Sequence, residues 1–106
     1  MTRTDPMVSV VIPAFNQARF LPAAIESTIA QTYRDREIIV VDDGSTDNTE
    51  EVERGFTDRR LTYLRQRNQG ASAARNAGVR ASSGRFIAFL DADDRWAADK
   101  LERHAP

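Results

Sequence analysis

The sequence of 106 residues has no cysteine, and its one histidine, His104, stands third from the end. A disulfide framework and a cysteine-based zinc site are therefore excluded, and so is a metal site made of several histidines. No apolar run approaches the roughly 20 residues that a membrane-spanning helix needs, and residues 1–7 lack the hydrophobic segment of a signal peptide. We therefore expect a cytoplasmic location, or a soluble part of a membrane-associated enzyme.

Two common phosphate-binding motifs are also missing. After the first apolar run there is neither G-x-G-x-x-G nor G-x-x-x-x-G-K-[ST], which argues against dinucleotide binding and against a P-loop. The single lysine, Lys100, follows the last apolar run, and this position argues against a receiver-like signalling domain. The formal net charge of −1 gives no reason to expect a nucleic acid as partner.

What is present is typical of one soluble globular domain over residues 1–106, with a flexible N-terminus over residues 1–7. Continuous apolar runs predict buried strands at residues 8–13 and 37–41, an alternating pattern predicts a strand with one wet face at residues 61–66, and a further apolar run predicts a buried strand at residues 86–90. Helical patterns lie between and after them, at residues 19–33, 45–56, 70–84 and 97–103. This alternation predicts an α/β fold with a mainly parallel sheet and right-handed crossovers.

Charge is distributed unevenly along the chain. Residues 42–53 carry six acids and no base, whereas residues 54–85 carry eight arginines and one acid, Asp58. An arginine-rich segment is usually solvated surface, but guanidinium groups also suit the geometry of phosphate. Both interpretations stay open: a solvated face, or a positive lining for an anionic ligand.

Polar residues gather in the four loops that follow the predicted strands, "PAFNQ", "DDGST", "RNQG" and "DADD". In an open α/β sheet the ligand site lies beyond the carboxyl ends of the strands. We therefore expect these four loops to meet at one site.

Asp91 and Asp93 follow the last predicted strand and flank Ala92. Alternate residues of an extended segment point the same way, so the two carboxylates can face one site. Mg²⁺ prefers oxygen ligands and typically takes one or two carboxylates plus substrate phosphates. The alternative is that these acids are ordinary turn and cap residues.

The predicted helix from Gly70 has no acid in its first turns, and Arg75 and Asn76 lie one turn in. Its N-terminus can therefore receive a phosphate, although Gly70 and Arg75 can equally be a turn residue and a surface residue. In "DDGST", the Asp42 and Asp43 carboxylates can accept hydrogen bonds from a base or a ribose, or the segment can be a turn with N-caps among Ser45, Thr46 and Asp47.

Two aromatic residues also have alternative roles. Phe15 can stack on a base or cover the edge of the core. For Trp96, core packing is the preferred interpretation.

Taken together, "VSVVIPAFN", "IIVVDDGSTDNT", "RNQGASAARNAGVRASSGRFIAFLDADD" and the following "W…DKLE" closely resemble family 2 glycosyltransferases of the GT-A fold, over residues 8–101. The resemblance implies a Rossmann-like, mainly parallel sheet flanked by helices, the nucleotide-diphospho-sugar transferase fold. It also implies a hexosyltransferase-type enzyme that transfers a sugar to an acceptor hydroxyl with inversion. The donor would be a nucleotide-diphospho-sugar, in the first place a UDP-sugar, used with Mg²⁺ or Mn²⁺.

The resemblance also implies roles for individual residues. The nucleoside pocket would be lined by Pro13, Ala14, Phe15 and Asn16. Asp43 would hydrogen-bond the base, while Asp42 would be structural. The positions near the nucleotide or donor would be Asn68, Gly70, Arg75 and Asp91. Asp91 and Asp93 match the D-x-D element that holds the metal, with Asp93 the more metal-facing of the two.

The sequence departs from the family pattern in length, because family members continue past the D-x-D into an acceptor-binding half with the general base. No acid in the last twelve residues matches that base, so Asp99 and Glu102 are expected on a helix surface. We expect a truncated, donor-binding half with no catalytic residue of its own and little transferase activity. The alternative is a non-catalytic nucleotide-sugar-binding half-domain, or a partner of another chain. An exposed apolar edge at residues 86–90 also predicts a homo-dimer.

Overall fold

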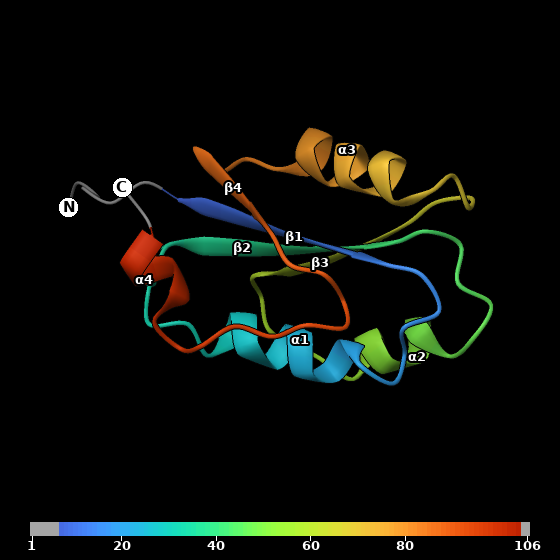
Figure 1. The fold of residues 1–106 in the computed structure, drawn as a ribbon, viewed down its shortest axis with the longest axis horizontal. Coiled ribbons are helices and arrows are strands. Elements are labelled where there is room, and N and C mark those ends of the chain that lie inside the picture. Colours follow the sequence, from blue (N-terminus) through green and yellow to red (C-terminus); the bar gives the residue numbers. More distant parts are fainter. Residues whose placement is uncertain (1–6, 105–106) are drawn as a thin grey trace.

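The computed structural model describes residues 7–104, in which four strands alternate with four helices (Figure 1). In chain order the elements are β1 (Val8–Ala14), α1 (Leu21–Ile29), β2 (Arg36–Asp42), α2 (Thr49–Arg54), β3 (Leu61–Arg65), α3 (Ala71–Ala81), β4 (Phe86–Phe89) and α4 (Lys100–His104). The predicted order and the predicted position of every strand and helix are confirmed, with differences at the ends. The expected flexible N-terminus lies, except for Met7, outside the described residues.

The four strands form one parallel sheet in the order β3-β2-β1-β4. In the register, Val8 of β1 is the Cα partner of Arg36 on one side and of Phe86 on the other. Because all strands are parallel, the loops after β1, β2, β3 and β4 leave the sheet at the same edge. This arrangement brings together the four polar loops that the sequence singles out.

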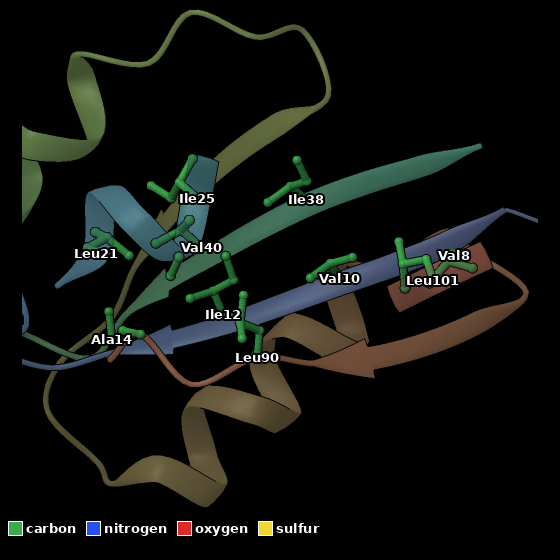
Figure 2. Packing of buried hydrophobic residues seen from close by; sticks show 12 residues of the cluster. Val8, Val10, Ile12, Ala14, Leu21, Ile25, Ile38, Val40, Leu90 and Leu101 are labelled. Carbon is green, nitrogen blue, oxygen red and sulfur yellow. The ribbon is translucent and has the colours of Figure 1, made fainter. Parts of the chain in front are cut away.

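Helices cover both faces of the sheet, with α3 on one face and α1 and α2 on the other (Figure 1). The larger cluster of buried side chains lies between the sheet and α1, α2 and α4, as Figure 2 shows for Ile12, Leu21 and Leu90, among others. A smaller cluster, including Val11 and Ala74, lies under α3. Burial on both faces explains why β1 and β2 are continuous apolar runs. Trp96 packs at the margin of the larger cluster, as expected.

Helix α3 lies very close to the sheet because it is made of small residues. A Cβ atom built on Gly78 would come within 2.3 Å of Val11 Cγ1. A larger residue at this position would push the helix away from β1, and with it the first turn of α3 at the edge where the polar loops meet.

The largest differences between predicted and observed helix ends are at the end of α1 and at the start of α2. Helix α1 ends at Ile29 and not at Tyr33, because the buried Arg36 guanidinium donates hydrogen bonds to the carbonyls of Thr28, Ile29 and Tyr33. These bonds satisfy carbonyls that the helix leaves free at its end. Helix α2 begins at Thr49, with Asn48 as the N-cap.

The expectation that residues 86–90 form a buried strand is wrong for most of the run. Strand β4 is an edge strand that pairs only with β1, and Phe86, Ile87 and Phe89 are exposed by 39%, 37% and 45%. Only Leu90, just after the strand, is fully buried. The exposed apolar edge on which the predicted homo-dimer depends is therefore present, while the dimer itself stays a prediction.

None of the helices in residues 7–104 has the length and apolar character to cross a membrane.

Candidate functional site

A cleft of about 430 Å³ opens at the carboxyl edge of the sheet, within the usual range of small-molecule sites. Its walls come from the end of β1, the loops after β2, β3 and β4, and the first turns of α3. The lining residues are Pro13, Ala14, Phe15, Gln17, Asp43, Asn68, Gly70, Ala71, Ala74, Arg75, Asp91, Ala92 and Asp93. All site residues predicted from the sequence therefore line one cleft, with the exception of Asn16.

The loop after β1 contributes an apolar wall. Pro13 and Ala14 line the cleft at the end of the strand, and the Phe15 side chain beside them is 44% exposed. Asn16 turns away from this lining. Its backbone has a positive φ of 51°, a conformation that asparagine tolerates better than most residues.

Asn16 instead joins the loops after β1 and β2. Its Oδ1 accepts hydrogen bonds from the backbone N–H groups of Thr46 (2.8 Å) and Asp47 (3.3 Å), and its own N–H donates to Ser45 Oγ at 2.9 Å. Ser45, Thr46 and Asp47, expected as N-caps of α2, serve largely as partners in this loop contact. Asn16 therefore stabilises the shape of the cleft from outside its lining.

Asp42 is fully buried at the end of β2 and belongs to the scaffold of the site. Its carboxylate accepts hydrogen bonds from the Ser45 N–H at 2.8 Å, from the Tyr63 hydroxyl and from Arg65 Nη1 at 2.9 Å. Burial, together with the bond to Asp42, raises the pKa of Tyr63 to about 12. The structural role expected for Asp42 is consistent with these contacts.

Asp43 lines the cleft but is almost completely buried. Oδ1 accepts hydrogen bonds from Gln66 Nε2 (2.8 Å) and the Gln69 N–H (2.9 Å). Oδ2 accepts from the Gly70 N–H (2.9 Å) and, at 3.3 Å, from Asn68 Nδ2. Burial opposes ionisation, but the bonds from Gln66, Gln69 and Gly70 outweigh it and lower the pKa of Asp43.

The Asp43 contacts hold the loop after β3 over the end of β2. A carboxylate offers about four lone-pair directions, and here four donors use them. Gly44 permits the approach of this loop, because a Cβ atom there would lie 2.7 Å from the Asn68 backbone nitrogen. A base can therefore hydrogen-bond Asp43 only if one of these loop donors, such as the Gln66 amide, moves aside.

Helix α3 presents its N-terminus to the cleft. Gly70 is the N-cap, with a φ of 101°, and no side chain caps the helix. The first turn carries no acid, and its N–H groups have no acceptor inside the helix. These free N–H groups and the helix dipole favour an anion at this end.

Asp91 and Asp93 lie on the opposite wall, in the loop after β4, and both are exposed. Ala92 between them is buried in the core, so the two carboxylates are the parts of the D-x-D segment that reach solvent. The nearest cation is Arg75, whose Nη2 lies 3.7 Å from Asp91 Oδ1.

The donor set of the D-x-D segment fits one class of metal. Within residues 7–104 no group of three or more histidine, cysteine or acidic side chains could hold a metal ion by itself. Two exposed carboxylates do suit Mg²⁺ or Mn²⁺, which can take the remaining oxygen ligands from substrate phosphates and water. Asp91 and Asp93 are thus able to hold such an ion together with a phosphorylated ligand.

Sequence reasoning missed several residues of the site. Gln17, Ala71, Ala74 and Ala92 line the cleft, and Gln66 and Gln69 hold Asp43. The small residues had a usable signal, since only a small side chain leaves room for a ligand at the start of a helix. The contacts of Gln66 and Gln69 with Asp43 had none, because they depend on how the loop after β3 folds over the end of β2.

Known glycosyltransferases are similar to this chain over most of its length. Residues 9–106 match the model of glycosyl transferase family 2. The Escherichia coli UDP-Glc:alpha-D-GlcNAc-diphosphoundecaprenol beta-1,3-glucosyltransferase WfgD is 44% identical over 99 residues. That alignment covers 92% of this chain and 39% of the relative, so the chain spans well under half the length of WfgD.

Two solved structures share the fold. Residues 1–349 of S. aureus TarS in complex with UDP-GlcNAc superpose with a TM-score of 0.86 at 26% identity, covering 92% of this chain and 29% of that TarS chain. The mannosyltransferase PcManGT from Pyrobaculum calidifontis, in complex with GDP-Man and Mn²⁺, gives 0.85 at 28% identity and covers 93% and 31%. These matches confirm the expected GT-A fold, here as a partial domain. The chain belongs to glycosyl transferase family 2.

Proposed function

We propose that this chain is the donor-binding part of a glycosyltransferase. It binds a nucleotide-diphospho-sugar, with a UDP-sugar as the first candidate, together with Mg²⁺ or Mn²⁺, for transfer of the sugar to an acceptor hydroxyl with inversion. One observation carries the proposal. A single cleft combines an exposed aromatic ring, an uncapped helix N-terminus and two exposed carboxylates.

The apolar end of the cleft suits the nucleoside. Phe15 offers its exposed ring for stacking on the base, and Pro13 and Ala14 form the apolar wall beside it. Asp43 can hydrogen-bond the base directly if the Gln66 amide gives way, and otherwise acts by holding the loop that contains Asn68 and Gly70.

The opposite end suits the diphosphate. The first turn of α3 directs free N–H groups at the cleft, and Arg75 adds a guanidinium from the second turn. Asp91 and Asp93 would hold the metal, Asp93 being the more metal-facing. A bound divalent ion would neutralise the charge that develops on the diphosphate as the sugar–oxygen bond breaks.

The relatives support this class of donor. WfgD is named as a UDP-Glc-dependent glucosyltransferase, TarS has been solved with UDP-GlcNAc, and PcManGT with GDP-Man and Mn²⁺. Two of the three use uridine nucleotides, which favours a UDP-sugar for this chain as well.

Inversion needs a base that deprotonates the acceptor hydroxyl. The acids lining the cleft in residues 7–104 are Asp43, Asp91 and Asp93. Each already has another role, because Asp43 holds the loop after β3 and Asp91 and Asp93 would hold the metal. We therefore expect residues 7–104 to bind the donor without transferring its sugar. A stand-alone nucleotide-sugar-binding module, or one that works with a partner chain, is the second candidate, and it would show the same binding.

Calorimetric titration of the chain with UDP, with and without Mn²⁺, tests the proposal. Binding should require the metal and should be lost in Asp93→Ala. Asp99→Ala is the matched control, because Asp99 lies outside the cleft and pairs with Arg103. Absence of UDP binding under all conditions, or full binding by Asp93→Ala, would contradict the proposal.

A further inference from the structure

Arg75 and Asp91 form an ion pair across the cleft, from the second turn of α3 to the loop after β4. Arg75 Nη2 lies 3.7 Å from Asp91 Oδ1, and both side chains are substantially exposed, by 41% and 66%. Arg75 is the only cationic residue among those that line the cleft in the described part of the chain.

The pair is loose compared with the other acid contacts at this edge of the sheet. Asp43 has four hydrogen-bond donors on its carboxylate, whereas within residues 7–104 the Asp91 carboxylate has the 3.7 Å contact with Arg75 and no closer donor. An exposed pair of this length contributes little to stability, typically less than about 1 kcal/mol. Arg75 is therefore free to exchange Asp91 for a better partner.

We propose that Arg75 is an internal counter-ion that opposes metal binding in the absence of nucleotide and supports it in the presence of nucleotide. The inference rests on the proposed function, because it takes the metal and the diphosphate to bind at this cleft. While Arg75 faces Asp91, a divalent cation entering the D-x-D segment must displace a positive charge or lie beside it. Both cost free energy, so the metal alone binds weakly.

When a nucleotide diphosphate is bound, Arg75 favours metal binding and no longer opposes it. Its oxygens offer the planar guanidinium a bidentate partner, which is a stronger contact than a carboxylate at 3.7 Å. Arg75 then leaves Asp91 to the metal and adds positive charge on the other side of the diphosphate. Metal and nucleotide consequently bind with positive coupling, each raising the affinity for the other by the same factor.

Arg75→Gln separates the two roles because it removes the charge and keeps a polar, though shorter, side chain. Mn²⁺ affinity without nucleotide, measured by electron paramagnetic resonance of the free ion, should rise about two- to fivefold, the range expected for an exposed ion pair. UDP affinity at saturating Mn²⁺, measured by calorimetry, should fall about tenfold or more, since a hydrogen bond to a charged group is lost. The two effects have opposite signs.

Two variants serve as controls. Arg80→Gln removes the same charge from the last turn of the same helix, outside the cleft, and should change neither affinity. Arg75→Lys keeps the charge and should preserve the weak binding of Mn²⁺ alone. Thermal unfolding of each variant checks that the fold is intact.

The outcomes distinguish this inference from the proposed function. If the wild-type chain binds UDP with Mn²⁺ but Arg75→Gln leaves the affinity for Mn²⁺ alone unchanged or lowers it, the counter-ion role is overturned and the donor site stands. If the wild-type chain does not bind UDP with Mn²⁺, both are overturned.

Discussion

Two acidic pairs lie at the same edge of the sheet, and their surroundings differ sharply. Asp42 and Asp43, at the end of β2, are 0% and 3% exposed and receive hydrogen bonds from β3 and the loop after it. Asp91 and Asp93, after β4, are exposed, and Asp91 has an arginine at 3.7 Å. The carboxylates of the first pair are used in hydrogen bonds within the protein, whereas those of the second pair are accessible to a ligand.

The position of each strand in the sheet explains the difference. Strand β2 is an inner strand, so its end is flanked by β3 and by the loop that leads to α3. Strand β4 is an edge strand with β1 as its single neighbour, so the segment after it is open on one side. Residue type alone does not separate scaffold from site, because both segments consist of aspartates at the carboxyl end of a parallel strand.

The strongest test of this contrast is Asp42→Ala. The substitution removes a buried carboxylate, so the Tyr63 hydroxyl and the Ser45 N–H lose their hydrogen-bond acceptor. It also removes the ion-pair partner of Arg65. The free energy of unfolding should fall by about 3 kcal/mol, as is typical when one partner of a buried charged network is removed. Urea denaturation measures it, and a loss below about 1 kcal/mol would show that Asp42 is not part of the scaffold.

Asp43→Asn should have the next largest effect. An amide keeps one acceptor oxygen, so its NH₂ group must face N–H donors of Gln69 or Gly70. We expect a loss of about 2 kcal/mol in the free energy of unfolding and faster hydrogen exchange at the Gln69 and Gly70 amides. Unchanged exchange at these two amides would mean that the loop holds its shape without Asp43.

The pH dependence of the free energy of unfolding tests the carboxylates that are held by partners within the protein. Arg60 lowers the pKa of Asp58 to about 2, and hydrogen bonds lower the pKa of Asp43. Such carboxylates stabilise the fold above the unfolded pKa of about 4, and this contribution is lost as the pH falls through the folded pKa. Because the Asp58–Arg60 ion pair is partly exposed, solvent screening limits this loss to about 1 kcal/mol, and Asp58→Asn should flatten the stability curve between about pH 4 and pH 2. A parallel curve for the variant would refute this.

The smallest effects on stability are expected for the open pair. Asp91→Asn and Asp93→Asn should change the free energy of unfolding by less than about 0.5 kcal/mol, because both side chains are exposed. Asp93→Asn should nevertheless abolish metal-dependent UDP binding. A destabilisation comparable to that of Asp42→Ala would mean that the two pairs do not differ in the way described.

Much of the fold and the location of the site follow from the sequence. Continuous apolar runs identify β1 and β2, and the rule for parallel sheets places the four polar loops at one edge. The exposure of β4 does not follow, because a run such as "FIAFL" is the same whether the strand is inner or outer. The end of α1 depends on Arg36, and the place of Asn16 depends on a loop about 30 residues away in the chain. Such contacts come from the tertiary structure and leave no local pattern.

The sheet order also bears on how the chain folds during synthesis. Strand β1 is made first and lies between β2, which begins at Arg36, and β4, which begins at Phe86. Until Phe86 has left the ribosome, one side of β1 has no partner, and the segment with Asp91 and Asp93 after β4 has not yet been made. A strand edge that stays unpaired during this part of synthesis can pair incorrectly with strands of other chains. Translation of the second half of this domain is therefore the stage at which we expect a nascent chain to need a chaperone.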